Sequence, residues 1–179
     1  MPLLKLKGFV SDDWTILGGE DALPAGGDIA LPWPRLQRDW DILAKHDGRL
    51  GVVFPNNEKV AQLRLYLPRL TLVALNFPAF NDGRSLSIAR QLRGEGYAGE
   101  IRAIGNVLPD LLQFMLQVGF DSFEVSERFS RQRWIDSLKR MSLTYQHNLA
   151  DVTTVQGAAA VWKARHGRTA NPTDRKNTG

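Results

Sequence analysis

The residues of this sequence best suited to chemistry lie in short polar segments that follow apolar runs. The richest segment, residues 77–84, reads FPAFNDGR and places Asp82, Gly83 and Arg84 directly before a helical pattern. A helix N-terminus presents unpaired backbone N–H groups, and an arginine adds a planar fork of donors. This combination is suited to phosphate, a sulfate-like anion or a carboxylate, so the segment is a candidate anion site.

Other polar residues extend this candidate site along the chain. The set of candidate ligand-binding residues comprises Asp82, Gly83, Arg84, Ser87, Arg90, Arg102, Asn106 and Asp110. A second interpretation is purely structural: Asp82 caps the helix, and Arg84 pairs with Asp110 or Glu124 to tie neighbouring loops together. Arg93 lies near the end of the same helical pattern, where a cation is favourable, and is interpreted as part of a solvated face.

Apolar periodicity predicts the elements that position these residues. Short strand-like runs alternate with helix-like runs, which is typical of βαβ units and a parallel sheet. The predicted strands are 50–54, 70–75, 100–104 and 121–125, and the predicted helices are 35–45, 58–67, 85–93, 109–118 and 126–145. In such a sheet every strand-to-helix loop lies at the carboxyl edge, where ligands bind.

The predicted fold class is therefore α/β, with a parallel sheet of about four strands and covering helices. An open three-layer sheet and a half-barrel-like sheet both remain possible, because strand order is invisible in sequence. Residues 1–35 are expected to be irregular because glycines and prolines interrupt them, although 15–17 and 28–31 are suited to an edge hairpin.

The distribution of charge bears on possible partners. The 179 residues carry a formal net charge of +4, and the segment 163–179 alone contributes all of it, so residues 1–162 are neutral. We expect one domain over 1–150, with its core at 50–145, and a basic, disordered tail over 151–179. A neutral body disfavours nucleic-acid binding.

Composition excludes several other classes. With no cysteine and only three histidines, the chain lacks the residues for a thiolate metal site or an iron–sulfur cluster, and we expect no metal site. The glycines at 94–99 match GxGxxG, but they follow a helical run and precede a strand, which is the reverse of a dinucleotide-binding loop. No cofactor is therefore assigned. The chain shows no bilayer-spanning run or signal peptide, so a cytoplasmic protein without membrane contact is expected.

Three stretches resemble the bacterial family known as domain of unknown function 934. They are FPAFNDGRSLSIARQLR at 77–93, GYAGEIRAIGNVLPD at 96–110 and GFDSFEV at 119–125, within a resemblance covering roughly residues 12–145. By motif, it points to Phe77, Pro78, Phe80, Asp82, Gly83, Arg84, Ser87, Arg90, Arg102, Gly105, Asp110 and Asp121. The chain departs from the family pattern at Leu111, where Gln is usual, and at Val118, where Cys is frequent.

The resemblance implies a role in sulfur metabolism. Such proteins are encoded beside sulfite reductase and other genes of assimilatory sulfate reduction, and they are labelled oxidoreductases of sulfite reduction. The expected function is an accessory protein of sulfite reduction that binds an anion or a partner at the Asp82/Arg84 rim. The implied partners are sulfite reductase subunits or another sulfur-assimilation enzyme. The alternative is an oxidoreductase with a small-molecule site at the carboxyl edge of the sheet.

Overall fold

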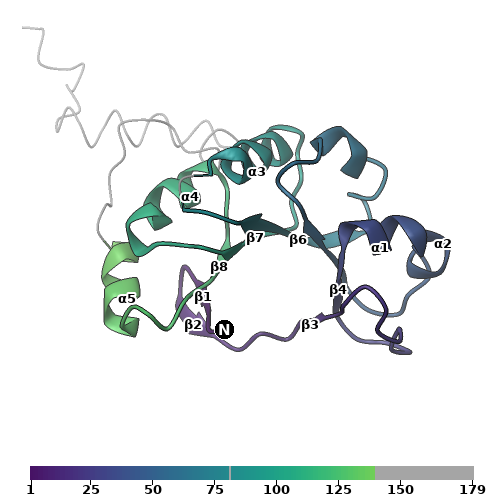
Figure 1. The fold of residues 1–179 in the computed structure, drawn as a ribbon, viewed down its shortest axis with the longest axis horizontal. Helices are drawn as coiled ribbons and strands as arrows, with labels where there is room; N and C mark the ends of the chain where they lie inside the picture. Colours follow the sequence, from purple (N-terminus) through teal and green to yellow (C-terminus); the bar gives the residue numbers. More distant parts are fainter. Residues whose placement is uncertain (81, 140–179) are drawn as a thin grey trace, which may run out of the picture.

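The computed structural model describes residues 1–80 and 82–139. Within them the chain forms one eight-stranded sheet with helices packed on one face (Figure 1). The strands are β1 (Leu3–Lys5), β2 (Gly8–Val10), β3 (Thr15–Ile16), β4 (Ile29–Pro32), β5 (Leu50–Phe54), β6 (Leu70–Phe77), β7 (Glu100–Gly105) and β8 (Ser122–Glu124). The helices are α1 (Trp33–Arg38), α2 (Trp40–Leu43), α3 (Arg84–Gly94), α4 (Leu112–Val118) and α5 (Arg131–Lys139), with 3-10 turns η1 (Val60–Leu63) and η2 (Pro109–Leu111). The predicted tail over 151–179 lies outside the described residues.

The strand order is β2-β1-β8-β7-β6-β5-β4-β3. From β3 to β8 each strand pairs in parallel with the next strand of the chain, and β1 pairs antiparallel with both β8 and β2. Crossovers of one hand between successive neighbours place the helices on the same face. The sheet is a curled half-barrel, which settles the choice left open by the sequence, but it has eight strands rather than about four.

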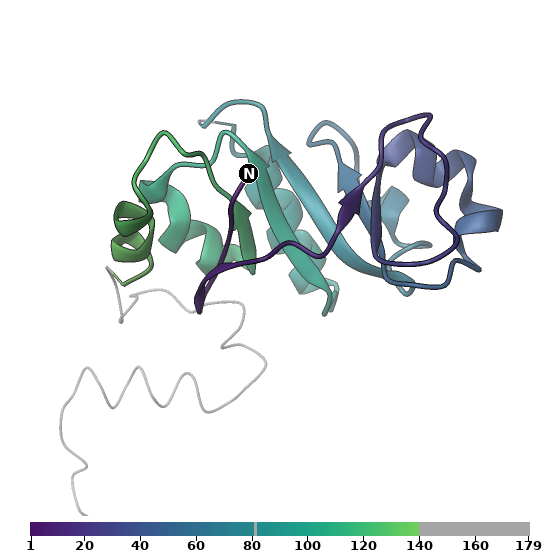
Figure 2. The same cartoon turned by 90° about the horizontal axis from the view of Figure 1, so that it is seen from below.

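The segment 11–14, which we call the strap, explains the curl. It joins β2 to β3, which are the two opposite ends of the sheet. Seven inter-strand steps of about 4.8 Å make an arc of roughly 34 Å. Five residue steps from Val10 to Thr15 span at most about 18 Å. The strap is therefore a chord that only a strongly curved sheet can accommodate, and Figure 2 shows it crossing the open side of the half-barrel.

Alternation along the strands separates the two faces of the sheet. On β7, Ile101 and Ala103 belong to the apolar core under the helices, as do Val73 and Leu75 on β6. The intervening residues face the concave side. That side carries Gly51, Ala74 and the polar Arg102 together with apolar residues such as Leu72.

Several predicted elements differ from the structure. Residues 15–16 and 29–32 form neighbouring strands as expected, but they pair in parallel and so make no hairpin. This geometry is stabilised by the buried Arg35, which donates hydrogen bonds to the carbonyls of Gly18 and Asp21 in the connecting loop. The N-terminal region is thus more regular than predicted.

Four predicted helices are shorter or divided, and the one expected over 109–118 consists of the 3-10 turn η2 followed by α4. The helix expected over 35–45 is split at Asp39 into α1 and α2. The helix expected over 58–67 is only the 3-10 turn η1, because Lys59 is extended and Pro68 disfavours helix at the residue before it. The helix expected from 126 begins at Arg131, where the Ser130 hydroxyl accepts a hydrogen bond from the backbone N–H of Arg133. The stretch 140–145 of that prediction lies outside the described residues.

Candidate functional site

The carboxyl edge of the parallel strands brings together the loops that follow β5, β6 and β7. We call residues 55–57, 78–80, 82–84 and 105–110 the rim surface. The side chain of Asn56 donates to Asp82 at 2.9 Å, which joins the first two loops. Asn106 donates from its side chain to the Pro78 carbonyl at 2.7 Å and from its backbone to the Phe77 carbonyl at 2.8 Å, which joins the last two. The rim surface is therefore cross-linked by hydrogen bonds.

Asp82 and Arg84 form a tight pair at the centre of this surface. The guanidinium Nε and Nη2 atoms of Arg84 lie 2.9 and 2.6 Å from the Asp82 carboxylate, and the Arg84 backbone N–H donates to the same carboxylate at 3.1 Å. The Asp82 side chain is 14% exposed, whereas that of Arg84 is 59% exposed. The guanidinium of Arg84 is thus exposed to solvent, and its orientation is fixed by the Asp82 carboxylate.

This pairing changes what the site can bind. Hydrogen bonds from the Arg84 side chain and backbone, with a contribution from Asn56, hold the pKa of Asp82 well below its usual range. The carboxylate therefore stays charged at neutral pH and neutralises Arg84 from within the chain. It also occupies an N–H group at the start of α3, where an external anion would bind. Anion binding at the rim stays a prediction.

Of the other candidate residues, Asn106 and Asp110 lie in the rim surface, and Asn106 contacts the 78–84 loop directly. Asp110 lies 3.6 Å from Arg133 of α5, and the carboxylate that Arg84 contacts is Asp82 rather than Asp110 or Glu124. Ser87 and Arg90 are exposed on α3, away from its buried face.

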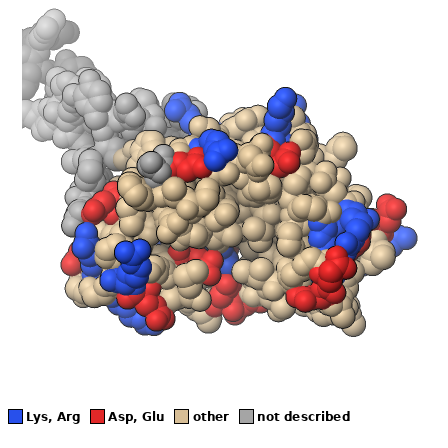
Figure 3. Space-filling view, in the orientation of Figure 1, with Lys and Arg blue, Asp and Glu red and all other residues tan. Residues whose placement is uncertain are grey.

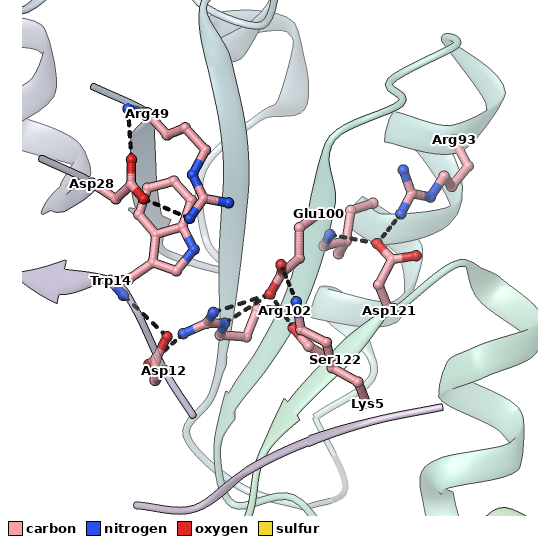
Figure 4. A network of polar contacts seen from close by, with 11 residues as sticks. Lys5, Asp12, Trp14, Asp28, Arg49, Arg93, Glu100, Arg102, Asp121 and Ser122 are labelled. Carbon is pink, nitrogen blue, oxygen red and sulfur yellow. Dashed lines mark hydrogen bonds and ion pairs between the residues drawn. The ribbon is translucent and has the colours of Figure 1, made fainter. Parts of the chain in front are cut away.

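Arg102 lies elsewhere, on the concave face within β7. Its side chain is only 2% exposed. It contacts Asp12 at 2.8 Å and Glu100 at 3.0 Å. Glu100 in turn accepts hydrogen bonds from Lys5 at 2.7 Å and Ser122 at 2.6 Å (Figure 4). Grouping Arg102 with the rim was wrong, because a residue near the amino end of a strand is distant from the carboxyl edge.

Most of this concave cluster, namely Lys5, Asp12, Glu100 and Ser122, is absent from the candidate residues predicted from the sequence. In the sequence, Asp12 resembles an ordinary loop residue. One signal was available: Glu100 and Arg102 are two apart in a strand, so their side chains share a face. The contributions of β1, β8 and the strap follow from strand order, which the sequence does not show.

Arg93 has a structural role rather than a solvated one. Its guanidinium donates to the backbone carbonyls of Gly119, Tyr97 and Gly99, and it pairs with Asp121. Asp121 also accepts the backbone N–H of Ile101 at 2.8 Å. These contacts lie beyond the amino ends of β7 and β8, where they tie α3 to the turn before β8. The prediction of a solvated Arg93 was therefore wrong.

A hollow of about 670 Å³ lies near the amino ends of β6 and β7, lined by residues that include Leu70, Tyr97 and Gly99. Burial raises the pKa of the Tyr97 phenol. Within the described part of the chain, no hydrogen-bond partner contacts its hydroxyl. This hollow lies at the opposite edge of the sheet from the rim surface and adds nothing to it.

Charged side chains of both signs are interspersed on the molecular face drawn in Figure 3. Surface ion pairs of the described residues include Arg38–Glu20 and Arg64–Glu95. The pairing agrees with the balanced charge of residues 1–162.

Comparison with protein families identifies the chain. A family model described as "Bacterial protein of unknown function (DUF934)" matches residues 51–156. The chain belongs to this family. The DUF934 match includes β5 through α5 and the whole rim surface, and it begins after the strap and the first four strands. The resemblance noted before residue 51 is thus not part of the match.

Searches of curated proteins and of solved structures found no match. Among residues 1–80 and 82–139, no helix is long and apolar enough to cross a membrane. In the same part of this DUF934 protein, no three His, Cys, Asp or Glu side chains are grouped to hold a metal ion.

Proposed function

We propose that this chain is an accessory protein of sulfite reduction that docks onto a partner protein of assimilatory sulfur metabolism through its rim surface. The sulfur connection comes from the family resemblance, whose members are encoded beside sulfite reductase. A sulfite reductase subunit is therefore the first partner to test.

The observation that carries the docking role is the preorganised pair Asp82–Arg84. Arginine and aromatic residues dominate the energetics of protein interfaces. Arg84 is exposed but oriented by two side-chain contacts, and Phe80 in the same loop is 60% exposed. Because Asn56 and Asn106 hold this loop from both sides, little conformational entropy would be lost on binding.

The same pair favours a protein partner over a small anion. Asp82 already supplies the negative charge that Arg84 needs, so a free anion would compete with a carboxylate of the same chain. A protein surface can instead contact the outer side of the guanidinium and the Phe80 ring together. The alternative is an oxidoreductase site at the same edge of the sheet. No feature of the described residues supports it independently of the rim surface.

The test is a binding measurement between the purified chain and purified sulfite reductase subunits by biolayer interferometry. We expect Arg84→Ala to weaken binding at least tenfold. Arg64→Ala is a matched control, because Arg64 is also 59% exposed and also paired with a carboxylate, Glu95, but at the other end of α3. That variant should bind like the wild type.

Absence of binding by the wild type, or equal weakening by both variants, would refute the docking role. A gene deletion gives a second measurement. Growth should fail on sulfate and on sulfite and be restored by sulfide, and the Arg64→Ala gene should complement it while the Arg84→Ala gene should not. A deletion strain that grows normally on sulfite would remove the link to sulfite reduction.

A further inference from the structure

A second polar site, unrelated to the rim surface, lies on the concave face of the half-barrel. Arg102, Ser122 and Lys5 occupy one row across three neighbouring strands, because Arg102 pairs in register with Ser122 and Ser122 with Lys5. Alternation places all three on the same face. The row presents hydrogen-bond donors from β7, β8 and β1.

Glu100 accepts hydrogen bonds from all three side chains of this row. Its carboxylate accepts from Lys5, Ser122 and Arg102 (Figure 4). Burial raises the pKa of Glu100, but the hydrogen bonds from Lys5, Ser122 and Arg102, together with the charge of Arg102, outweigh this effect, so the net shift is downward. Glu100 is thus charged at neutral pH, and its single negative charge faces two cations, Lys5 and Arg102.

The strap supplies the second negative charge of the cluster, which is the carboxylate of Asp12. The Nη1 atom of Arg102 contacts Asp12 at 2.8 Å, so Lys5, Arg102, Glu100 and Asp12 balance to zero. Asp12 is the most accessible carboxylate of the cluster, with a side chain 31% exposed against 15% for Glu100. The Lys5 side chain is 39% exposed, so the cluster reaches solvent.

The strap is docked on the concave face by its one large side chain. The Trp14 ring lies over Gly51, so closely that a Cβ atom added to this glycine would lie 3.0 Å from the ring. The guanidinium of Arg49 stacks on the ring at 5.0 Å and pairs with Asp28. The strap has no helix or long strand of its own, so Trp14 and Asp12 account for much of its attachment.

We propose that the strap is displaceable and that Asp12 occupies the binding site of an oxyanion on the concave face. When the strap moves away, the row of Arg102, Ser122 and Lys5 carries one uncompensated positive charge. A carboxylate or a tetrahedral oxyanion then takes the place of Asp12. The strap acts as an internal competitor that ties anion binding to opening of the half-barrel.

Removing the charge of Asp12 tests this competition. Isothermal titration calorimetry with sodium sulfate, at constant ionic strength, should show at least tenfold tighter binding to Asp12→Asn than to the wild type. Asp28→Asn is the matched control, because it also removes a carboxylate paired with an arginine near the strap, but its partner Arg49 is half exposed. The control should bind sulfate no better than the wild type. A parallel titration with acetate shows whether a planar carboxylate fits better than a tetrahedral ion.

Second-site variants distinguish sulfate binding at this row of residues from a non-specific effect of the salt. In the Asp12→Asn background, Arg102→Met should abolish the binding. If Arg102→Met does not fold, Lys5→Met carries the test, and it should weaken sulfate binding at least fivefold. Three results would overturn the proposal. Sulfate could bind equally to Asp12→Asn and Asp28→Asn, it could bind Asp12→Asn with the same affinity after Lys5→Met is added, or its binding to Asp12→Asn could be undetectable. Because the rim variants are not involved, failure here leaves the docking role untouched.

Discussion

Replacing Glu100 by Gln should destabilise the protein by about 3 kcal/mol. Breaking a buried ion pair costs roughly 3–5 kcal/mol, because the remaining charge stays buried without compensation. Arg102 is 2% exposed and cannot reach water, whereas Glu100 retains 15% exposure and Asp12 still contacts Arg102. The lower end of the range therefore applies.

Urea unfolding at pH 7, followed by circular dichroism, measures this change directly. Glu20→Gln is the control, because Glu20 also pairs with an arginine, Arg38, but is 88% exposed. Exposed pairs contribute little, so this variant should leave the unfolding midpoint unchanged. If Glu100→Gln costs less than about 1 kcal/mol, the concave cluster does not depend on its charge, and the reasoning from burial fails.

The same carboxylate predicts a pH dependence. Burial raises the pKa of Glu100, but its hydrogen bonds and the charge of Arg102 outweigh this effect, so the folded pKa lies below the ordinary value of 4.5. A group with a depressed folded pKa contributes stability above its unfolded pKa and loses it as pH falls through the folded value. The difference between wild type and Glu100→Gln should thus be full at pH 7 and shrink below pH 4.5. A difference that stays constant down to pH 3 would contradict this assignment.

Two further predictions concern backbone geometry and the amino edge. Gly105 has a φ of 88°, and an added Cβ would lie 2.6 Å from the Asn76 side-chain oxygen, so Gly105→Ala should cost more than about 2 kcal/mol in urea unfolding. Gly94→Ala meets no atom within 4 Å and should be neutral or slightly stabilising. Arg93→Met removes hydrogen bonds to three backbone carbonyls and should lower stability by about 2–3 kcal/mol, whereas the exposed Arg90→Met should not. Equal effects within either pair would contradict these structural roles.

The strands of the central sheet were predictable because each is a short apolar run between turn signals. The predicted 50–54 coincides with β5, and 70–75 and 100–104 lie within β6 and β7. The predicted segment 121–125 is longer than the strand observed there, β8, by one residue at each end. Helices on polar or proline-flanked stretches were less predictable, because their ends depend on caps such as Ser130 that local patterns identify poorly.

The rim was partly predictable for the same reason. Strand-to-helix loops must share the carboxyl edge of a parallel sheet, so the proximity of Asp82, Arg84 and Asn106 followed from the element pattern. The partner of Arg84 did not, because Asp110 or Glu124 was expected and the contact is with Asp82. A hydrogen bond requires its two atoms to lie within a few ångströms of each other. The pattern of strands and helices predicts only which loop a residue lies in, so it does not identify the hydrogen-bond partner.

The α/β class, the carboxyl-edge loops and the family signature can be recognised in the sequence, because hydrophobic periodicity and local motifs are properties of neighbouring residues. That the eight strands of the described residues curl into a half-barrel, and that the strap closes it, is visible only in the folded molecule. Folding also brings Asp12 to Arg102 and Lys5 to Glu100, residues that are at least 90 positions apart in each pair. These contacts depend on strand order and curvature, which arise when the whole chain packs and which no local stretch encodes.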